Sequence, residues 1–396
     1  MNKTNKLTQQ ISFAACPACG AKSFEKLLPI RQEYIFGACG QCGLTYTAPF
    51  PTNLELEQIY KGFGQTCPIG QVFDRGSDFS AIARDRYSFI TRKQDVTAKQ
   101  RLLEIGSSYG LFLRHFLDTA WETHGVEPSV APAELSRQEW GLHNINNCIF
   151  AEVEYPPATF DIICSFHVIE HLGDPIGMLQ KIRLLLKPEG RLFLVTPNLE
   201  KIKANISEYY FLYYGLHLMF FTPLTIKCLL CRCGFEVISI EQEVDRIAES
   251  GSMIIEAELS TPVVGNCPEE IQHASRYAYK LAEMKEKLKK SFFDLVAAGH
   301  RIAIFGGGSH TKGLLACFDG EFPKIELIFD DDPAKNEQEL SGIPIVPFRD
   351  QACGEIDVMV VSSLASEASI LDRLSTDVII NKKRIRCYGI YRDFLK

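Results

Sequence analysis

Short apolar runs alternate with amphipathic stretches along most of this chain. Residues 101–105 form one apolar run, which leads through a turn of small residues into a helical pattern over 111–116. This alternation predicts an α/β fold in which helices cover both faces of a mainly parallel sheet. The strands that we expect lie at 101–105, 124–127, 147–150, 160–166, 191–195, 235–240 and 253–259.

The alternation returns near the C-terminus after a long helical stretch. Residues 268–298 carry closely spaced Lys and Glu, which predicts a largely solvated helix that bridges two domains. Apolar runs then follow at 301–305, 325–329, 356–361 and 386–390, and they predict a smaller Rossmann-like α/β domain. The boundaries that we predict are an N-terminal ribbon at 1–52, a central domain at 53–262 with an aromatic insertion at about 199–223, a bridging helix at 263–299 and a last domain at 300–396.

Composition narrows the class of protein. The chain has 396 residues, of which 46% are hydrophobic and 23% charged, so it should fold as an ordinary globule of two or three domains. Its net charge of −7 argues against nucleic acid as a partner. No apolar stretch resembles a signal peptide or is long enough to span a membrane, so we expect a cytoplasmic protein without a membrane partner. Fourteen cysteines in that compartment predict metal ligands and buried thiols rather than disulfides.

Two pairs of cysteines near the N-terminus have the spacing of a metal site. Residues 16–20 read Cys-Pro-Ala-Cys-Gly and residues 39–43 read Cys-Gly-Gln-Cys-Gly. Each glycine permits a tight turn that directs two thiolates at one ion. We therefore predict a zinc ribbon whose closed, structural Zn²⁺ site consists of Cys16, Cys19, Cys39 and Cys42, with free thiols in a degenerate ribbon as the alternative.

The turn after residues 101–105 has the character of a ligand-binding corner. Glu104, Gly106 and Gly110 follow the spacing Glu-x-Gly-x-x-x-Gly, and small residues allow a ligand to approach the backbone at the start of a helix. Glu127 lies about twenty residues past this turn, at the end of the next expected strand. A carboxylate at that place can accept both ribose hydroxyls of a nucleoside. The alternatives are an ordinary turn of an α/β protein and a solvated carboxylate.

These residues resemble the motifs of the class I S-adenosylmethionine (SAM) methyltransferases. The family motif E/D-x-G-x-G-x-G matches at 104–110 with Ser108 in place of the middle glycine, and the run Gly-Val-Glu-Pro-Ser at 125–129 matches the next motif. Phe160 to Leu172 and Leu184 to Asn198 match the later motifs, so that the resemblance spans Leu102 to Leu259. It implies SAM as the cofactor, held by Glu104, Gly106, Ser108, Tyr109, Gly110, Glu127, Glu152, Phe166 and His167.

His167, Glu170 and His171 have a second interpretation. The two histidines stand at helical spacing beside the glutamate, which is compatible with a metal site. We favour instead the interpretation that the resemblance implies, a loop that closes over the sulfonium end of SAM.

The acceptor should bind near the aromatic run from Glu208 to Pro223. Such a run suits a pocket that holds a small molecule and excludes water. His217 is the candidate general base, because imidazole titrates near working pH, and a structural histidine is the alternative. The three-part arrangement also resembles the deoxysugar C-methyltransferases, which implies a catalytic role for Tyr214 beside His217. Leu216 stands where that family has a glutamate, and this departure weakens the argument for carbon deprotonation.

The turn at Arg301–Gly313 repeats the strand–turn–helix pattern. Gly306, Gly308, His310 and Lys312 could hold the phosphates of a nucleotide attached to the acceptor, with His310 and Lys312 supplying charge. A scaffold domain whose glycines only allow close packing is the alternative.

Together these patterns predict an enzyme that transfers a methyl group from SAM to a small molecule. A nucleotide-linked sugar or related carbohydrate is the expected acceptor, which would place the enzyme in carbohydrate biosynthesis. The alternatives are an O- or N-methyltransferase of another small metabolite and a SAM- or nucleotide-binding protein without turnover.

Overall fold

The computed structural model describes most of the chain. The described residues are 15–31, 34–50, 76–92, 94–201, 205–213, 216–243, 251–262, 271–349, 353–354, 356–364 and 366–395. They fall into two compact units, each described below by itself. The first contains residues 1–29, 33–202 and 216–275, and the second contains residues 30–32, 203–215 and 276–396.

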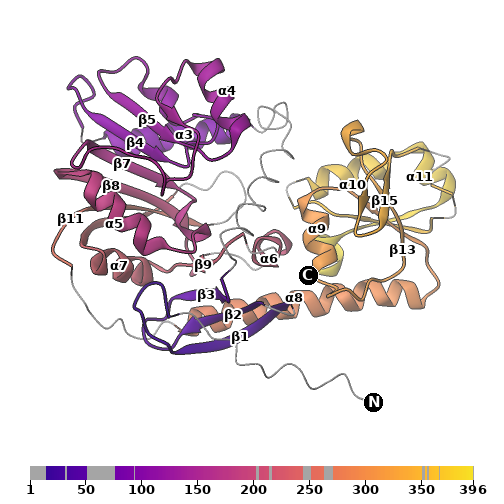
Figure 1. Ribbon diagram of the computed structural model, residues 1–396. Coiled ribbons are helices and arrows are strands. Elements are labelled where there is room, and N and C mark those ends of the chain that lie inside the picture. Colours follow the sequence, from indigo (N-terminus) through magenta and orange to yellow (C-terminus); the bar gives the residue numbers. More distant parts are fainter. Residues whose placement is uncertain are drawn as a thin grey trace. The chain divides into compact units, whose positions relative to one another are not determined.

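A seven-stranded sheet forms the centre of the first unit (Figure 1). Its strands lie in the spatial order β10-β11-β8-β7-β4-β5-β6, and β11 runs antiparallel to both of its neighbours. The strand order reverses between β4 and β7, and in such sheets ligands bind outside the carboxyl ends of the strands at this point. The strands are β4 (Arg101–Ile105), β5 (Glu122–Val126), β6 (Ile145–Asn146), β7 (Phe160–Phe166), β8 (Leu186–Pro197), β10 (Phe235–Gln242) and β11 (Ser252–Leu259).

Two apolar layers cover this sheet, as expected for strands buried on both faces. One layer joins β4 and β8 to α5 (Pro175–Leu185) and α7 (Pro223–Arg232). The other joins the opposite side chains of the same strands to α3 (Gly76–Thr91) and α4 (Val130–Trp140). Short 3₁₀ helices η1 (Leu113–Phe116) and η2 (Ile169–His171) follow β4 and β7.

Local sequence explains where the helices begin. Asp174 caps α5 by accepting a hydrogen bond from Gly177 N at 2.9 Å, and Pro175 occupies its first turn. Thr222 and Thr225 form a reciprocal capping box at the start of α7.

A smaller sheet extends the N-terminal cysteine segment. Its order is β1-β2-β3-β9, with β1 (Phe24–Arg31), β2 (Tyr34–Cys39), β3 (Thr45–Ala48) and β9 (Met219–Phe220). Strand β9 comes from a distant part of the chain and pairs with β3. The ribbon therefore holds the segment that contains His217. Thr47 N donates to Leu218 O at 2.9 Å, and Tyr46 pairs with Met219.

The second unit is a smaller α/β domain with a doubly wound sheet of order β14-β15-β13-β12-β16-β17. All neighbours except β14 and β15 are parallel. The strands are β12 (Ile302–Phe305), β13 (Ile325–Phe329), β14 (Glu339–Leu340), β15 (Ile343–Val346), β16 (Val358–Val361) and β17 (Arg386–Gly389). The helices are α9 (Ser309–Ala316), α10 (Glu367–Ser375) and α11 (Val378–Lys383), with the short η3 (Pro333–Lys335) and the π-helical η4 (Ile390–Phe394).

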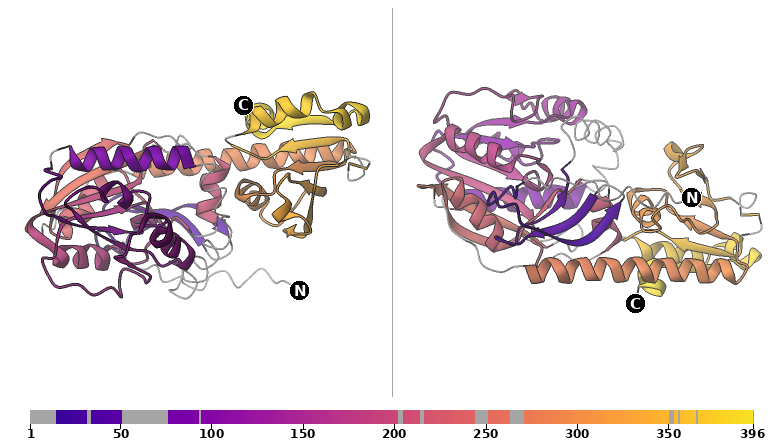
Figure 2. Two further views of the ribbon diagram at one scale, coloured as in Figure 1. Left: turned by 90° about the horizontal axis from the view of Figure 1, so that it is seen from above. Right: turned by 60° about the horizontal axis from the view of Figure 1, so that its bottom comes forward.

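Two helices differ from the sequence expectation. Both views in Figure 2 show α8 (Ile271–Ala297) as one uninterrupted helix. The helix is not largely solvated, because one of its faces is buried at Ala274, Tyr277, Leu281, Leu288 and Phe292. The aromatic helix α6 (Ile206–Tyr213) belongs to the second unit and not to the central domain in which we had placed it.

Packing explains the place of α6. A Cβ atom on Gly313 of α9 would lie 2.7 Å from Ile206 O, so the glycine permits the two helices to touch. The ammonium group of Lys285 also lies 4.9 Å from the centre of the Tyr209 ring.

Smaller differences concern single segments. The third strand of the central sheet is β6 at 145–146, before the expected position at 147–150. Cys228 is disulfide-bonded, which contradicts the expectation of thiols and metal ligands alone. Among the described residues, no helix combines the length and apolar composition that crossing a lipid bilayer requires.

Candidate active site

The turn after β4 is held in a conformation that suits close approach of a ligand. Gly106 and Gly110 have φ values of +78° and +70°, and Ser108 also has a positive φ of 46°. Gly106 N and Ser107 N both donate to Val126 O, at 2.8 and 3.1 Å, which fixes the turn against the end of β5. A ligand can therefore meet a rigid stretch of backbone at the carboxyl end of the sheet.

Glu127 lies beside this turn, as the sequence predicted. Its Oε2 accepts a hydrogen bond from Ser108 N at 2.9 Å, and its Oε1 accepts one from Ser129 N at 2.8 Å. The side chain is buried, and burial raises the pKa of Glu127 above its ordinary value. These two bonds orient a carboxylate beside the turn after β4, where it can accept hydrogen bonds from ribose hydroxyls.

The other predicted SAM residues lie in different surroundings. Glu104 is buried within β4, and burial raises its pKa well above the ordinary range, which favours the neutral carboxyl group. Phe166 is buried at the end of β7, whereas Glu152 is exposed. Tyr109 O accepts a hydrogen bond from Trp140 Nε1 at 3.0 Å.

His167 stands at the centre of an ionic network that joins three segments. Its Nδ1 lies 3.2 Å from Glu170 Oε1, and its Nε2 lies 3.7 Å from Glu243 Oε2. Burial alone would lower the pKa of His167, but the hydrogen bonds to both carboxylates raise it to about 9. Arg86 of α3 donates to Glu243 at 2.6 and 3.1 Å, and its guanidinium group lies over the Phe166 ring at 4.6 Å.

This network includes functional candidates that sequence reasoning missed. Arg86 and Glu243 lie outside the recognised motifs and are 157 positions apart. Each resembles an ordinary surface residue in the sequence, so no local pattern could have identified the pair.

His217 is brought next to Glu170 and His171. The side chains of these three residues each offer a ligand atom, and the three atoms lie within 4.8 Å of one another. The rings of His171 and His217 have centroids 4.9 Å apart. Burial, and then the neighbouring His171, lower the pKa of His217 to about 3, so its ring is neutral at working pH but weakly basic. Tyr214, the second predicted catalytic residue, lies outside the described residues.

The four predicted zinc ligands gather into one cluster. Cys16 Sγ lies 3.5 Å from Cys42 Sγ, and Cys19 Sγ lies 3.5 Å from Cys39 Sγ. Cys39 is held in a tight turn by two backbone hydrogen bonds. Cys39 N donates to Leu44 O at 2.8 Å, and Gly43 N donates to Cys39 O at 2.9 Å. The geometry of the four thiols is compatible with one zinc ion.

The glycine-rich turn of the second unit also has an acidic neighbour. Asp330 follows β13, and its Oδ2 accepts hydrogen bonds from Gly307 N at 2.6 Å and from Lys335 Nζ at 3.0 Å. Burial would raise the pKa of Asp330, but these bonds lower it, so the group is a carboxylate. The apolar run at 325–329 predicts this strand, but Asp330 is not among the site residues predicted from the sequence.

His310 does not supply charge as predicted. Its Nδ1 lies 2.8 Å from Ser362 Oγ and its Nε2 lies 2.8 Å from Tyr391 OH, so the ring is held between two hydroxyl groups. Burial lowers the pKa of His310 to about 4, which keeps it neutral. Gly306 and Gly308 flank the turn, where Gly306 has a φ of +108°, and Lys312 is half-buried in α9.

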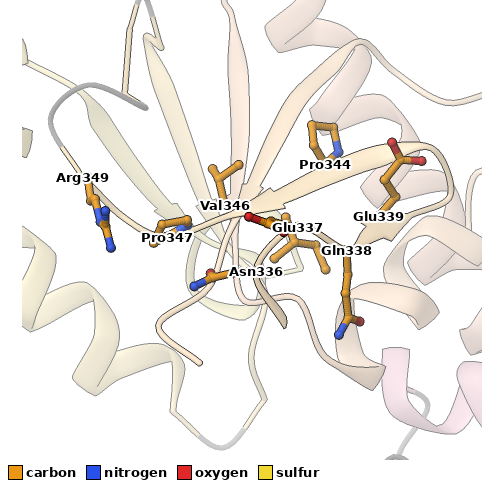
Figure 3. Close-up of a pocket in the computed structure, with 9 residues that line it drawn as sticks. Asn336, Glu337, Gln338, Glu339, Pro344, Val346, Pro347 and Arg349 are labelled. Carbon is orange, nitrogen blue, oxygen red and sulfur yellow. The ribbon is translucent and has the colours of Figure 1, made fainter. Parts of the chain in front are cut away.

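A depression of about 340 Å³ lies near the same turn. It is formed by β15 and by the segments that precede and follow this strand, as Figure 3 shows. Ile345, which lines it, would lie 3.1 Å from a Cβ atom on Gly307. The lining residues are Asn336, Glu337, Gln338, Glu339, Pro344, Ile345, Val346, Pro347 and Arg349.

Comparison with known proteins decides the nature of the central domain. Residues 77–240 match a family model described as a methyltransferase domain. This match identifies residues 77–240 as a methyltransferase domain. The Gly106 turn, Glu127, Phe166 and His167 all lie within the matched range.

The methyltransferase domain resembles curated O-methyltransferases over part of their length. The ubiquinone biosynthesis O-methyltransferase of Vibrio cholerae is 26% identical over 135 residues, which are 33% of this chain and 53% of the relative. The enzyme of the same description from Idiomarina loihiensis is 29% identical over 118 residues, or 28% and 49% of the two chains. The chain thus spans about half the length of the curated relatives it matches.

One solved structure is matched over a larger share of this chain. It is the 1,6-didemethyltoxoflavin-N1-methyltransferase of Burkholderia thailandensis with bound 1,6-didemethyltoxoflavin and S-adenosylhomocysteine. The likeness has a TM-score of 0.43 at 16% identity and covers 60% of this chain and 99% of that one.

Replacing Gly106 with alanine should distort the turn after β4 and weaken the SAM binding that we expect there. An added Cβ would lie 2.6 Å from Val168 Cγ2, and the positive φ would cost about 1–2 kcal/mol besides the overpacking. We expect a lower melting temperature and SAM affinity reduced at least about tenfold. Gly141→Ala is the matched control, because Gly141 has a φ of +68° but no atom within 4 Å of an added Cβ. Equal effects of the two substitutions on SAM binding would contradict this prediction.

Replacing Glu127 with alanine should weaken SAM binding about 10- to 100-fold. Hydrogen bonds to a charged acceptor contribute about 1.5–3 kcal/mol, and each 1.4 kcal/mol is about tenfold in affinity. Burial raises the pKa of Glu127 above its ordinary value. As the pH falls through this raised pKa, the carboxylate is protonated and the affinity of the wild type for SAM should fall. Titration calorimetry with S-adenosylhomocysteine at several pH values measures both effects. In Glu127→Gln the affinity for S-adenosylhomocysteine should be low and should not change with pH in this range. If the variant shows the same pH dependence as the wild type, another group causes it.

Proposed function

We propose that this protein transfers the methyl group of SAM to a small-molecule acceptor. The observation that carries the proposal is the oriented Glu127 carboxylate, whose Oε2 lies 2.9 Å from Ser108 N in the turn after β4 of a methyltransferase domain. SAM would supply an electrophilic methyl group on its sulfonium. The residues around it fit such a ligand, because Gly106 and Gly110 hold the turn at positive φ next to the oriented Glu127 carboxylate.

In this proposal, the chain contributes mainly by binding and orientation. Glu127 would accept the ribose hydroxyls, and the turn from Gly106 to Gly110 would face the methionine part of SAM. Phe166 and the His167 network would close the side next to the sulfonium. Holding the acceptor in line with the carbon–sulfur bond removes much of the entropic barrier to the displacement.

His217 is the proposed centre of acceptor activation. It lies beside the post-β7 segment, where His171 Nδ1 contacts Leu216 O at 2.5 Å. A base is most effective when its pKa is near the working pH. With a pKa of about 3, His217 can accept a proton but needs another group to acidify the acceptor. We retain Tyr214 as a catalytic candidate.

For the acceptor, we propose a nucleotide-linked sugar or a related carbohydrate. This rests on the resemblance to the deoxysugar C-methyltransferases and on the second unit, where Gly306–Gly308 meets Asp330. Asp330 would accept ribose hydroxyls as Glu127 does, with phosphates near the start of α9 and Lys312. Methylation of a hydroxyl on another metabolite is the second candidate, and the O-methyltransferase relatives favour it. An N-methyltransferase and a binding protein without turnover are the remaining alternatives.

We also propose that Cys16, Cys19, Cys39 and Cys42 hold one Zn²⁺ ion. Four thiolates complete a tetrahedral shell, so the ion would have no open position for a substrate and would act structurally. Its place in the ribbon would stabilise β3, which supports the segment of His217 through β9.

Titration calorimetry tests the proposed function. The protein is titrated first with SAM and then, with S-adenosylhomocysteine present, with a panel of nucleotide sugars. Binding of SAM together with a nucleotide-sugar signal that is lost in Asp330→Asn or Lys312→Ala would support the sugar acceptor. Binding of SAM without any nucleotide signal would favour another metabolite. Failure to bind SAM would overturn the proposal.

A further inference from the structure

Three side chains in the first unit form a cluster whose donor set is that of a metal site. Glu170 and His171 come from η2 after β7, and His217 comes from the segment before β9. Their ligand atoms lie within 4.8 Å of one another, and Glu170 and His217 are only 1% and 8% exposed. One carboxylate and two imidazoles therefore converge in a buried place next to the cofactor turn.

Hydrogen bonds hold this cluster from several sides. Glu170 Oε2 accepts a hydrogen bond from Thr196 Oγ1 at 3.1 Å. Glu170 O accepts one from Leu218 N at 2.8 Å, and Leu218 O in turn accepts one from Thr47 N at 2.9 Å. The segment of His217 is thus fixed between η2 and strand β3, so the backbone brings the three residues together before any ligand arrives.

The orientation of His171 matches that of a metal-binding histidine. Its Nδ1 lies 2.5 Å from Leu216 O, and a carbonyl oxygen can only accept, so Nδ1 carries the proton. In the neutral ring, Nε2 is then the nitrogen without a proton, and this atom lies 4.0 Å from Glu170 Oε1. Histidines that bind metals commonly donate their other ring N–H to a backbone carbonyl or a carboxylate.

We propose that Glu170, His171 and His217 bind a divalent transition-metal ion that holds a hydroxyl-bearing acceptor. Imidazole nitrogen and carboxylate oxygen form bonds of about 2.0–2.2 Å to Zn²⁺, and small side-chain rotations would bring the three atoms to that distance. Three protein donors leave coordination positions open, unlike the four cysteines of the ribbon. The cysteine cluster offers four thiolates, whereas this site offers two nitrogens and one oxygen. The two sites therefore differ in the metal ions that they prefer.

The ion gives the proposed methyl transfer a route to acceptor activation, so the inference rests on the proposed function. A hydroxyl bound to the ion loses its proton to water more readily, because the cation stabilises the oxyanion. The oxygen lone pair then forms a bond to the methyl carbon. The carbon–sulfur bond breaks, and its electron pair remains on sulfur as a neutral thioether. Val168, between His167 and Ile169, lies against the Gly106 turn, which places the cluster beside the cofactor end of the domain.

Cobalt uptake tests this site. The purified full chain is dialysed against Co²⁺, and zinc and cobalt per chain are counted by mass spectrometry. We expect about one cobalt ion per wild-type chain without the intense thiolate-to-cobalt absorption that substitution in the cysteine cluster would produce. Glu170→Gln and His171→Asn should each lose this ion. His143→Ala is the control, because His143 is exposed on the loop after α4.

The possible outcomes separate the metal site from the methyltransferase activity. Calorimetry with S-adenosylhomocysteine shows whether each variant is folded. If the wild-type chain takes up no cobalt, the metal site is excluded. It is also excluded if the bound cobalt shows thiolate absorption and Glu170→Gln binds the same amount with the same absorption. Methyl transfer without cobalt uptake would leave the proposed function intact and overturn the metal site. If the wild-type chain takes up cobalt, Glu170→Gln does not, and the wild-type chain fails to bind SAM, the metal site is supported and the proposed function is overturned.

Discussion

Replacing His217 with alanine should reduce methyl transfer about 100- to 10,000-fold while leaving SAM binding unchanged. This range is what a positioned proton-transfer group contributes, and we expect a lost metal ligand to have a comparable effect. His217 lies beside Glu170 and His171, whereas Glu127 and Ser108 form the proposed ribose site. Initial rates with labelled SAM and calorimetry with S-adenosylhomocysteine measure the two quantities separately.

The control for this substitution is His143→Ala, which removes an exposed histidine from the same unit. It should leave turnover and SAM affinity at wild-type values. Turnover in His217→Ala within about twofold of the wild type would remove His217 from the mechanism. Cobalt uptake distinguishes the two roles of the residue, since a general base alone would leave uptake intact and a metal ligand would not.

Replacing Cys39 with serine should release zinc and unfold the ribbon. Binding of structural zinc contributes about 10–16 kcal/mol to the folding of zinc-finger peptides, so loss of one of four ligands removes a large part of the ribbon's stability. Cys39 lies 3.5 Å from Cys19 at the end of β2, inside a cluster that packs with the core of the first unit. Zinc content and thermal unfolding measure the effect.

The same substitution should also lower turnover more than SAM binding. Strand β3 pairs with β9, and Thr47 N donates a hydrogen bond to Leu218 O at 2.9 Å. An unfolded ribbon would therefore release the segment that contains His217. Cys148→Ser is the matched control, because Cys148 is a half-buried free thiol of the same unit. Cys39→Ser with unchanged zinc content and melting temperature would show that the cluster is not a zinc site.

Short-range patterns predicted much of the fold. The runs around Leu102, Ile163 and Leu194 identified β4, β7 and β8, because strands buried on both faces must be continuously apolar. The glycine spacing from Gly106 to Gly110 marked a turn that the structure places at the switch point. The position of α6 could not be predicted in this way. Its aromatic side chains would suit either unit, and the close approach that Gly313 permits emerges only when α6 and α9 are folded together.

The sequence by itself determined the central sheet, the cysteine cluster and the glycine turn with Glu127 at the end of the next strand, since each depends on residues that are close in the chain or at the ends of neighbouring strands. Only the tertiary structure brought together Arg86 with Glu243 and His217 with Glu170 and His171. These contacts join segments whose meeting depends on sheet order and on β9 pairing with the ribbon. A charged residue or a histidine has the same local pattern whether it faces solvent or a distant partner, because burial and pairing are properties of the folded chain.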